Sequence, residues 1–133
     1  MRTGEDGAEV AARVSVLVIP ADGPAWLERV EATYETWCRL VEDVGAEAVF
    51  FPDETGAAWV AANGKTSSPQ MERNLRAGGF LDRLVPGFGR KDWVAGTAIV
   101  VGLDPATGDF AELSTGLLSA AADYGLLAMD QKR

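Results

Sequence analysis

The sequence predicts a single small α+β domain, with a mostly antiparallel sheet of four or five strands and two or three helices packed on it. Three observations predict this class. The chain has 133 residues, which is enough for one domain with a hydrophobic core and too short for two ordinary ones. Short β-branched runs alternate with segments of helical period, and turn residues separate them. The order of these elements favours a ferredoxin-like arrangement.

The first strand follows a polar leader. Residues 1–11 are rich in glycine and acidic side chains and carry no sustained apolar period, so we expect a flexible leader there. The domain is then expected over residues 12–130. Residues 13–19 are apolar and β-branched and are followed by Pro20, which predicts the first strand of the sheet.

A long amphipathic helix is predicted over residues 26–44. Apolar residues share one side of a helical wheel there, and acidic residues share the other side. Pro24 suits the first turn of a helix, where its missing N–H costs nothing, and Gly45 suits a left-handed end. This helix would bury both Trp26 and Trp37 in the core.

The middle of the chain predicts a hairpin and a second helix. Residues 46–51 and 57–62 are short apolar runs on either side of a turn sequence, which is typical of an antiparallel hairpin. A helix is expected over residues 69–85, with Ser67 or Ser68 as its cap. Two successive glycines would either break this helix or let it lie close against the sheet. Its buried face would consist of Met71, Leu75, Gly78, Leu81 and Val85.

The longest apolar run, W-V-A-G-T-A-I-V-V-G-L at residues 93–103, predicts the buried central strand. A turn follows it, and residues 110–113 are expected to return as a short strand. Residues 114–129 are rich in alanine and leucine and begin with a serine that suits a helix cap. We therefore expect a C-terminal helix.

The chain contains no histidine. This excludes nucleophile activation by histidine, zinc catalysis with imidazole ligands and an imidazole proton shuttle. Cys38 is the only cysteine, so neither an intrachain disulfide nor a thiolate cluster can form. No apolar run is long enough to span a bilayer, and the N-terminus lacks a signal sequence, so we expect a cytoplasmic protein without a membrane role. We expect no catalytic residue, no metal site and no cofactor.

Charge is unevenly distributed along the chain. The net charge is -8, yet residues 65–91 carry six basic side chains against two acidic ones. One hypothesis is therefore a nucleotide or anion binder, and the alternative interpretation is a solvated surface with internal salt bridges. The candidate anion-binding residues are Lys65, Arg73, Arg76, Arg83, Arg90 and Lys91.

Acidic residues of the predicted first helix suggest a second kind of surface. Their expected position on one exposed face makes them candidates for contact with another protein. A further hypothesis is that this face imitates the phosphates of nucleic acid. Direct binding of nucleic acid is disfavoured, because phosphate neutralisation dominates that affinity and the chain is acidic. The residues of this face are Glu28, Glu31, Glu35, Glu42 and Asp43.

Three segments of the chain resemble one family. They are V-L-V-I-P-A-D-G at residues 16–23, V-F-F-P-D-E-T-G at residues 49–56 and W-V-A-G-T-A-I-V-V-G at residues 93–102. In this order and spacing they are similar to the domain of unknown function 3846, a family of small proteins from actinobacteria, their phages and other mobile elements. The family carries an asparagine after the hairpin in a Leu-Pro-x-Asn context. Asn63 and Asn74 are the candidates here, and neither keeps that context.

The resemblance implies an origin in a phage or mobile element, where small acidic proteins often act by binding a host protein. It implies no activity, cofactor or particular partner. Together with the missing histidine, it leads us to expect a non-enzymatic interaction protein that binds a host protein. The anion binder and the nucleic-acid mimic remain alternatives, and the sequence leaves the oligomeric state open, a homodimer included.

Overall fold

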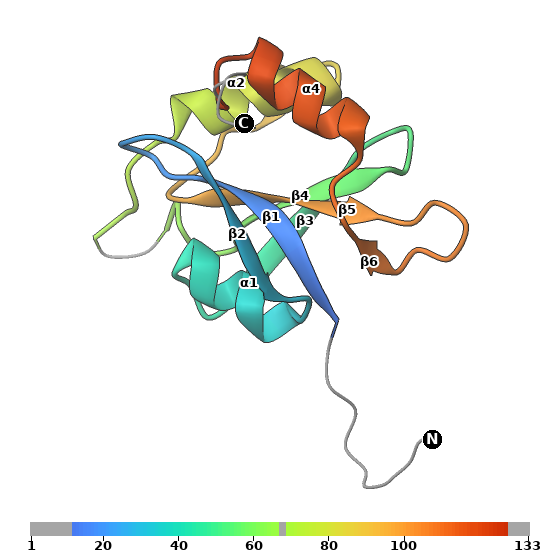
Figure 1. Cartoon of the computed structure of the whole chain (residues 1–133). Helices are drawn as coiled ribbons and strands as arrows, with labels where there is room; N and C mark the ends of the chain where they lie inside the picture. The colour runs from blue at the N-terminus through green and yellow to red at the C-terminus, as the bar shows by residue number, and fades with distance from the viewer. Residues whose placement is uncertain (1–11, 67–68, 128–133) are drawn as a thin grey trace, which may run out of the picture.

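A six-stranded antiparallel sheet with helices on both faces makes up the computed structural model, which describes residues 12–66 and 69–127 (Figure 1). The strands are β1 (Arg13–Ile19), β2 (Trp26–Glu31), β3 (Ala46–Phe50), β4 (Gly56–Ala61), β5 (Ala98–Leu103) and β6 (Phe110–Ala111). The helices are α1 (Tyr34–Val41), α2 (Leu75–Leu84), α3 (Phe88–Lys91) and α4 (Thr115–Asp123). The predicted α+β class is confirmed. The predicted leader and the proposed caps Ser67 and Ser68 lie outside the described residues. The C-terminal helix, expected to run to residue 129, ends earlier than predicted, at Asp123.

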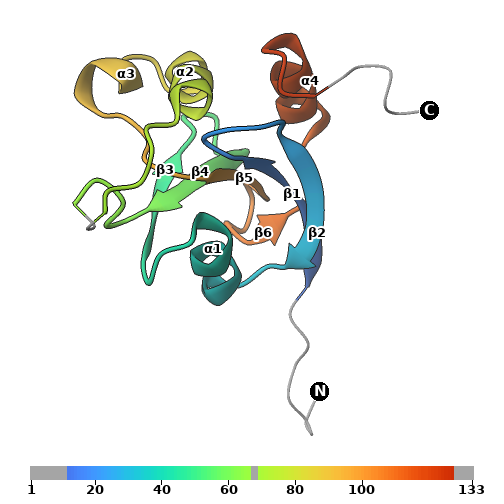
Figure 2. The same ribbon diagram turned by 90° about the vertical axis from the view of Figure 1, so that its left-hand side faces the viewer.

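Strand β5 lies at the centre of the sheet. The strand order is β2-β1-β5-β4-β3, β6 pairs with the end of β5, and all of these pairings are antiparallel. The ferredoxin-like arrangement is not confirmed, because a β1–β2 hairpin precedes the first helix and helices cover both faces. Figure 2 shows α1 on one side of the sheet and α2, α3 and α4 on the other.

The hydrophobic core has two layers, one on each face of the sheet. The layer under α1 contains Val16, Val18, Trp37, Ile99 and Val101. The layer under α2 and α4 contains Leu17, Ile19, Phe80, Leu81 and Val100. Because both faces of β5 are covered, its sequence is a continuous apolar run without alternation.

The central strand is shorter than predicted. The expectation covered residues 93–103, whereas β5 begins at Ala98. Gly96 adopts a φ of 75°, which interrupts the extended chain, and Ala95 forms an isolated bridge with Arg73. Trp93 therefore lies in a connecting segment and not in the sheet.

The single long helix predicted over residues 26–44 is wrong. Its first part is strand β2, which pairs with β1 along its whole length, and only Tyr34–Val41 is helical. The sequence of β2 suits both a helix and a strand, and pairing with β1 determines the outcome. Trp26 is consequently 44% exposed, whereas Trp37 is fully buried as predicted.

Helix α1 also begins and ends at residues other than those predicted. The Thr33 side chain accepts a hydrogen bond from the Thr36 N–H at 3.1 Å and begins the helix. Glu42, at a φ of 63°, ends it in the left-handed region that we expected at Gly45. The predicted Pro24 helix start is therefore also wrong.

Helix α2 begins later than predicted, at Leu75, and the two glycines do not break it. Its buried residues are Ala77, Phe80 and Leu81, so the face that meets the sheet is centred on other residues than those predicted. Leu75, predicted to be buried, is 72% exposed. The predicted buried face of this helix is therefore wrong in part.

Candidate functional site

Two of the six basic residues predicted to bind an anion are used within the fold. Arg76 donates to the backbone oxygens of Pro20, at 2.9 Å, and of Gly23, and so holds the loop between β1 and β2. The Arg83 guanidinium lies over the Tyr124 ring, with Cζ 5.3 Å from the centroid. These two cations therefore contact different parts of the fold and do not form a common anion site with each other.

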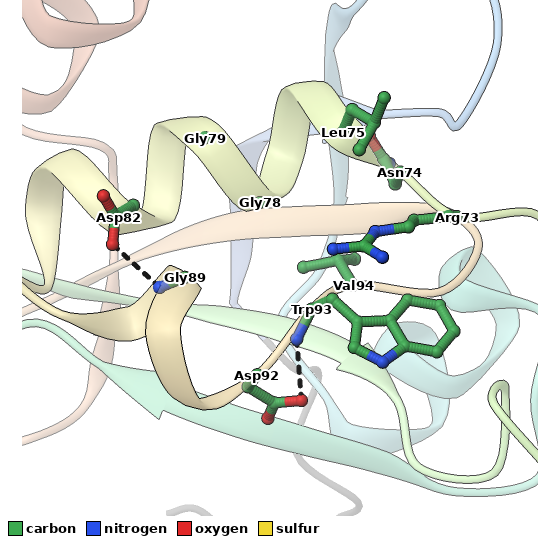
Figure 3. Close-up of a pocket in the computed structure, with 10 residues that line it drawn as sticks. All are labelled: Arg73, Asn74, Leu75, Gly78, Gly79, Asp82, Gly89, Asp92, Trp93 and Val94. Atoms are coloured by element: carbon green, nitrogen blue, oxygen red, sulfur yellow. Dashed lines mark hydrogen bonds between the residues drawn. The ribbon is translucent and has the colours of Figure 1, made fainter.

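Two other cations converge on the indole of Trp93, which is half-buried. The Lys65 Nζ lies 4.8 Å from the ring centroid and the Arg73 Cζ lies 5.2 Å from it, and Figure 3 shows Arg73 beside the ring. Lys65 also forms an ion pair with Asp92. Burial alone would raise the pKa of Asp92, but Lys65 and the Trp93 N–H lower it below its usual value.

The remaining two cations, Arg90 and Lys91, lie exposed on α3. The six basic residues are thus divided among three environments. The structure brings together only Lys65 and Arg73, at Trp93.

Two hollows share Asp92 and Trp93 as a common wall. The first has a volume of about 220 Å³ and lies beside α2, where Leu75 and Gly78 also line it (Figure 3). The second has a volume of about 300 Å³ and lies between the β3–β4 hairpin and Phe88. Trp93 and Asp92 therefore lie between two neighbouring hollows.

Both hollows carry mixed charge. Arg73 lines the first together with Asp82 and Asp92, and Lys65 lines the second together with Glu47 and Asp92. Carboxylates outnumber cations in each lining, so a phosphate placed there would meet repulsion as well as attraction. The charge of these linings therefore does not favour an isolated anion.

The five acidic residues predicted on one helix face are distributed over three segments, because the predicted helix does not form. Glu28 and Glu31 lie on β2, and their odd separation of three places them on opposite faces of the strand. Asp43 follows α1 and accepts a hydrogen bond from the Asn63 N–H at 2.7 Å. Burial would raise the pKa of Asp43, but hydrogen bonds from Asn63 and from nearby backbone N–H groups lower it. The set comprises Glu28, Glu31, Glu35, Glu42 and Asp43.

Asn74 is buried and has a structural role that the sequence did not reveal. Its Oδ1 accepts the Ala77 N–H at 3.0 Å, which begins α2. Its Nδ2 donates to the backbone oxygens of Ile19 and Gly96, each at 2.9 Å. One amide therefore joins the end of β1, the start of α2 and the segment before β5.

Comparison with known proteins finds no matching family model, no matching curated protein and no matching solved structure. Within residues 12–66 and 69–127, no group of three His, Cys, Asp or Glu side chains is placed to hold a metal ion. The same residues include no helix with the length and apolar character needed to cross a membrane. Function is therefore inferred from the geometry around Trp93.

Proposed function

We propose that the protein is a non-enzymatic interaction protein of a phage or mobile element, and that it binds a host protein through the surface around Trp93. The supporting observation is a half-buried tryptophan, flanked by Lys65 and Arg73, between two open hollows. Tryptophan and arginine are the side chains most enriched at the energetic centres of protein interfaces. The exposed Leu75 extends this surface with apolar area.

The size of the hollows also favours a protein partner. Small-molecule sites usually enclose about 300–1,000 Å³ and cover most of the ligand. The first hollow, at about 220 Å³, lies below this range, and the second, at about 300 Å³, only reaches its lower limit. A partner protein can place side chains in both and bury the indole of Trp93 between them.

The first test is retention of a host protein by the immobilised full chain in an actinobacterial lysate. The wild type and Trp26→Ala should retain the same protein, whereas Trp93→Ala should lose it. Trp26 is a matched control because it is also a partly exposed tryptophan, and it lies on β2. Retention of the same protein by Trp93→Ala, with an unchanged melting temperature, would contradict the proposal, as would turnover of a substrate.

A second variant separates binding from folding. Gly78 borders the first hollow, and an added Cβ there would meet no atom within 4 Å. Leucine is favoured over glycine in a helix by about 0.8 kcal/mol, so Gly78→Leu should not lower stability. We expect it to fill the hollow and to weaken binding of the retained protein.

An anion binder is the second candidate, supported by the convergence of Lys65 and Arg73 on Trp93 and by the exposed cations of α3. Thermal-shift measurements with nucleotides and with sulfate test it. A ligand present at 100 times its Kd stabilises a protein by about 2.7 kcal/mol. The absence of any shift would leave this candidate without support.

A further inference from the structure

Strand β3 lies at one end of the sheet, and in the described part of the chain no strand pairs with its outer side. Two hydrogen bonds fix the direction of its backbone groups: the Phe51 N–H donates to Gly56 and the Ala62 N–H donates to Gly45, each at 3.0 Å. Bonded and non-bonded pairs alternate along an antiparallel ladder. The odd-numbered residues of β3 therefore face β4, and its even-numbered residues face outward.

Tyr34 closes one of these outward positions. Its hydroxyl accepts the Ala46 N–H at 3.0 Å and donates to the Ala46 oxygen at 3.3 Å. The outward N–H and C=O groups of Ala48 and Phe50 have no such partner among the described residues. Two donors and two acceptors thus stand in a row on an open strand edge.

Both faces beside this edge offer apolar contact. On the α1 face, Tyr34, Val44 and Phe50 are 48%, 91% and 64% exposed. On the opposite face lies the second hollow, which Trp93 and Phe88 line. A strand added to β3 would alternate its side chains between these two surfaces.

The charge around the edge is acidic. Glu47 lies on β3 itself and lines the second hollow, and Asp53 and Glu54 lie exposed in the turn after the strand. Lys65 is the cation of that hollow, and it is paired with Asp92. A second copy of the chain, with its own charge of -8, is disfavoured, whereas a basic segment complements this edge.

We propose that β3 binds an extended segment of a partner protein by strand addition, and that this segment alternates apolar and basic residues. Its backbone would bond to Ala48 and Phe50. Its apolar side chains would cover Phe50 and Tyr34, and its basic side chains would reach Glu47 in the second hollow. The inference rests on the proposed function in that the occupant is a protein, and it adds the mode and the chemistry of recognition.

The test measures the binding of a fluorescent peptide, Val-Lys-Val-Arg-Val-Lys-Val with blocked ends, to the full chain by anisotropy. Ala48→Pro removes an outward N–H and keeps the ladder with β4, so the fold should persist. The loss of this edge hydrogen bond should raise the Kd of the peptide by about ten-fold or more. A peptide with glutamate at the three basic positions should not bind.

Leu27→Pro is the matched control on the other edge of the sheet. The Ala32 N–H donates to Ala12 at 2.8 Å, so the even-numbered residues of β2 face β1 and Leu27 faces outward. This variant should bind the peptide as the wild type does. If Ala48→Pro fails to fold, Phe50→Lys replaces it, because the side chain is 64% exposed and an edge lysine opposes strand pairing.

Unchanged affinity in a folded Ala48→Pro variant would overturn strand addition. So would a failure of the basic peptide to bind the wild type, or binding of the acidic peptide with the same affinity as the basic one. If the wild type forms a concentration-dependent dimer and Ala48→Pro abolishes it, the occupant of β3 is a second copy of the chain and not a basic partner, which would overturn the proposed occupant. If Trp93→Ala loses the host protein while Ala48→Pro retains it, strand addition fails and the proposed function stands. If no host protein is retained but the peptide binds through Ala48, strand addition stands and the proposed function fails.

Discussion

The two ends of the sheet present opposite kinds of edge. On β2, Arg29 forms an ion pair with Glu112 at 2.7 Å, and its backbone oxygen accepts a hydrogen bond from Arg13 at 3.1 Å. Charged side chains of this kind discourage the pairing of an edge with another strand. On β3, by contrast, one tyrosine hydroxyl closes a single position and an exposed Phe50 remains.

The protection of each edge of the sheet is therefore determined by the sequence of its own edge strand. The β2 sequence, W-L-E-R-V-E, places charge at half of its positions, whereas the β3 sequence, A-E-A-V-F, carries one charge. Protection against strand pairing is therefore present at one end and largely missing at the other. Strand addition uses an open sheet edge with pockets for alternate side chains beside it, and the proposal for β3 rests on this arrangement.

The largest effect is expected for a substitution in the core that supports both edge strands. Trp37 lies in the core layer that also contains Val30 of β2 and Ala46 of β3. Its ring stacks on that of Trp59, with the ring centroids 6.5 Å apart. Trp37→Ala should lower the free energy of unfolding by about 3–5 kcal/mol, because a large buried side chain leaves a cavity. Chemical denaturation measures this. The exposed Trp26→Ala should cost less than about 0.5 kcal/mol, and similar losses in both variants would contradict the assigned burial.

A pair of proline variants tests the direction of the β3 backbone. Val49→Pro removes a hydrogen bond to β4 and should cost about 1–3 kcal/mol or more, since the partner oxygen loses its donor. Ala48→Pro should cost clearly less, because its N–H points to the open side. Thermal denaturation of the Val49→Pro and Ala48→Pro variants measures the two losses of stability. A larger loss at position 48 would reverse the assigned alternation.

Removal of two of the three charges of β2 should make its edge resemble that of β3. The exposed pair of Arg29 and Glu112 contributes at most about 1 kcal/mol, so Arg29→Thr with Glu31→Thr should leave the fold intact. The new edge should pair with other strands, and sedimentation should then show self-association that rises with concentration. A monomeric variant would mean that charge does not protect β2.

The smallest expected effect is a dependence on pH at Trp93. The pKa of Asp92 is lowered by Lys65 and the Trp93 N–H against the opposing effect of burial. A lowered folded-state pKa means that the stabilisation is present above the usual aspartate value of about 4 and is lost as the pH falls below it. Asp92→Asn should remove this part of the acid dependence of unfolding. An identical acid profile in both proteins would show that the ion pair contributes nothing.

The sequence predicted those elements that depend on local chemistry. The β3–β4 hairpin was predicted because its turn residues and flanking apolar runs are contiguous, and α4 was predicted with its Ser114 cap. The β2 segment was predicted as helix because its apolar residues fit both periods, and only the pairing with β1 distinguishes them. Which strands form the edges depends on pairings between distant segments, and these leave no local signal.

The candidate site was only partly predictable for the same reason. The basic residues are close in sequence, yet Arg76 and Arg83 point to the β1–β2 loop and to Tyr124. The cluster at Trp93 depends on the turn at Gly96, which places Trp93 outside the sheet, and the sequence did not predict this turn. The role of Asn74 depends on carbonyl groups 55 and 22 residues away in the chain.

Those separations have a consequence for the order of folding. Asn74 accepts the first hydrogen bonds of helix α2, from the N–H groups of Ala77 and Gly78, and its own amide is held by carbonyl groups at the end of β1 and before β5. Contacts of long range form slowly, because closing the intervening loops costs entropy before the contact compensates for it. The surface around Trp93 should therefore be among the last parts of the nascent chain to acquire its shape. A chain that stops before β5 would carry every basic residue of this surface and still be unable to bind the proposed partner.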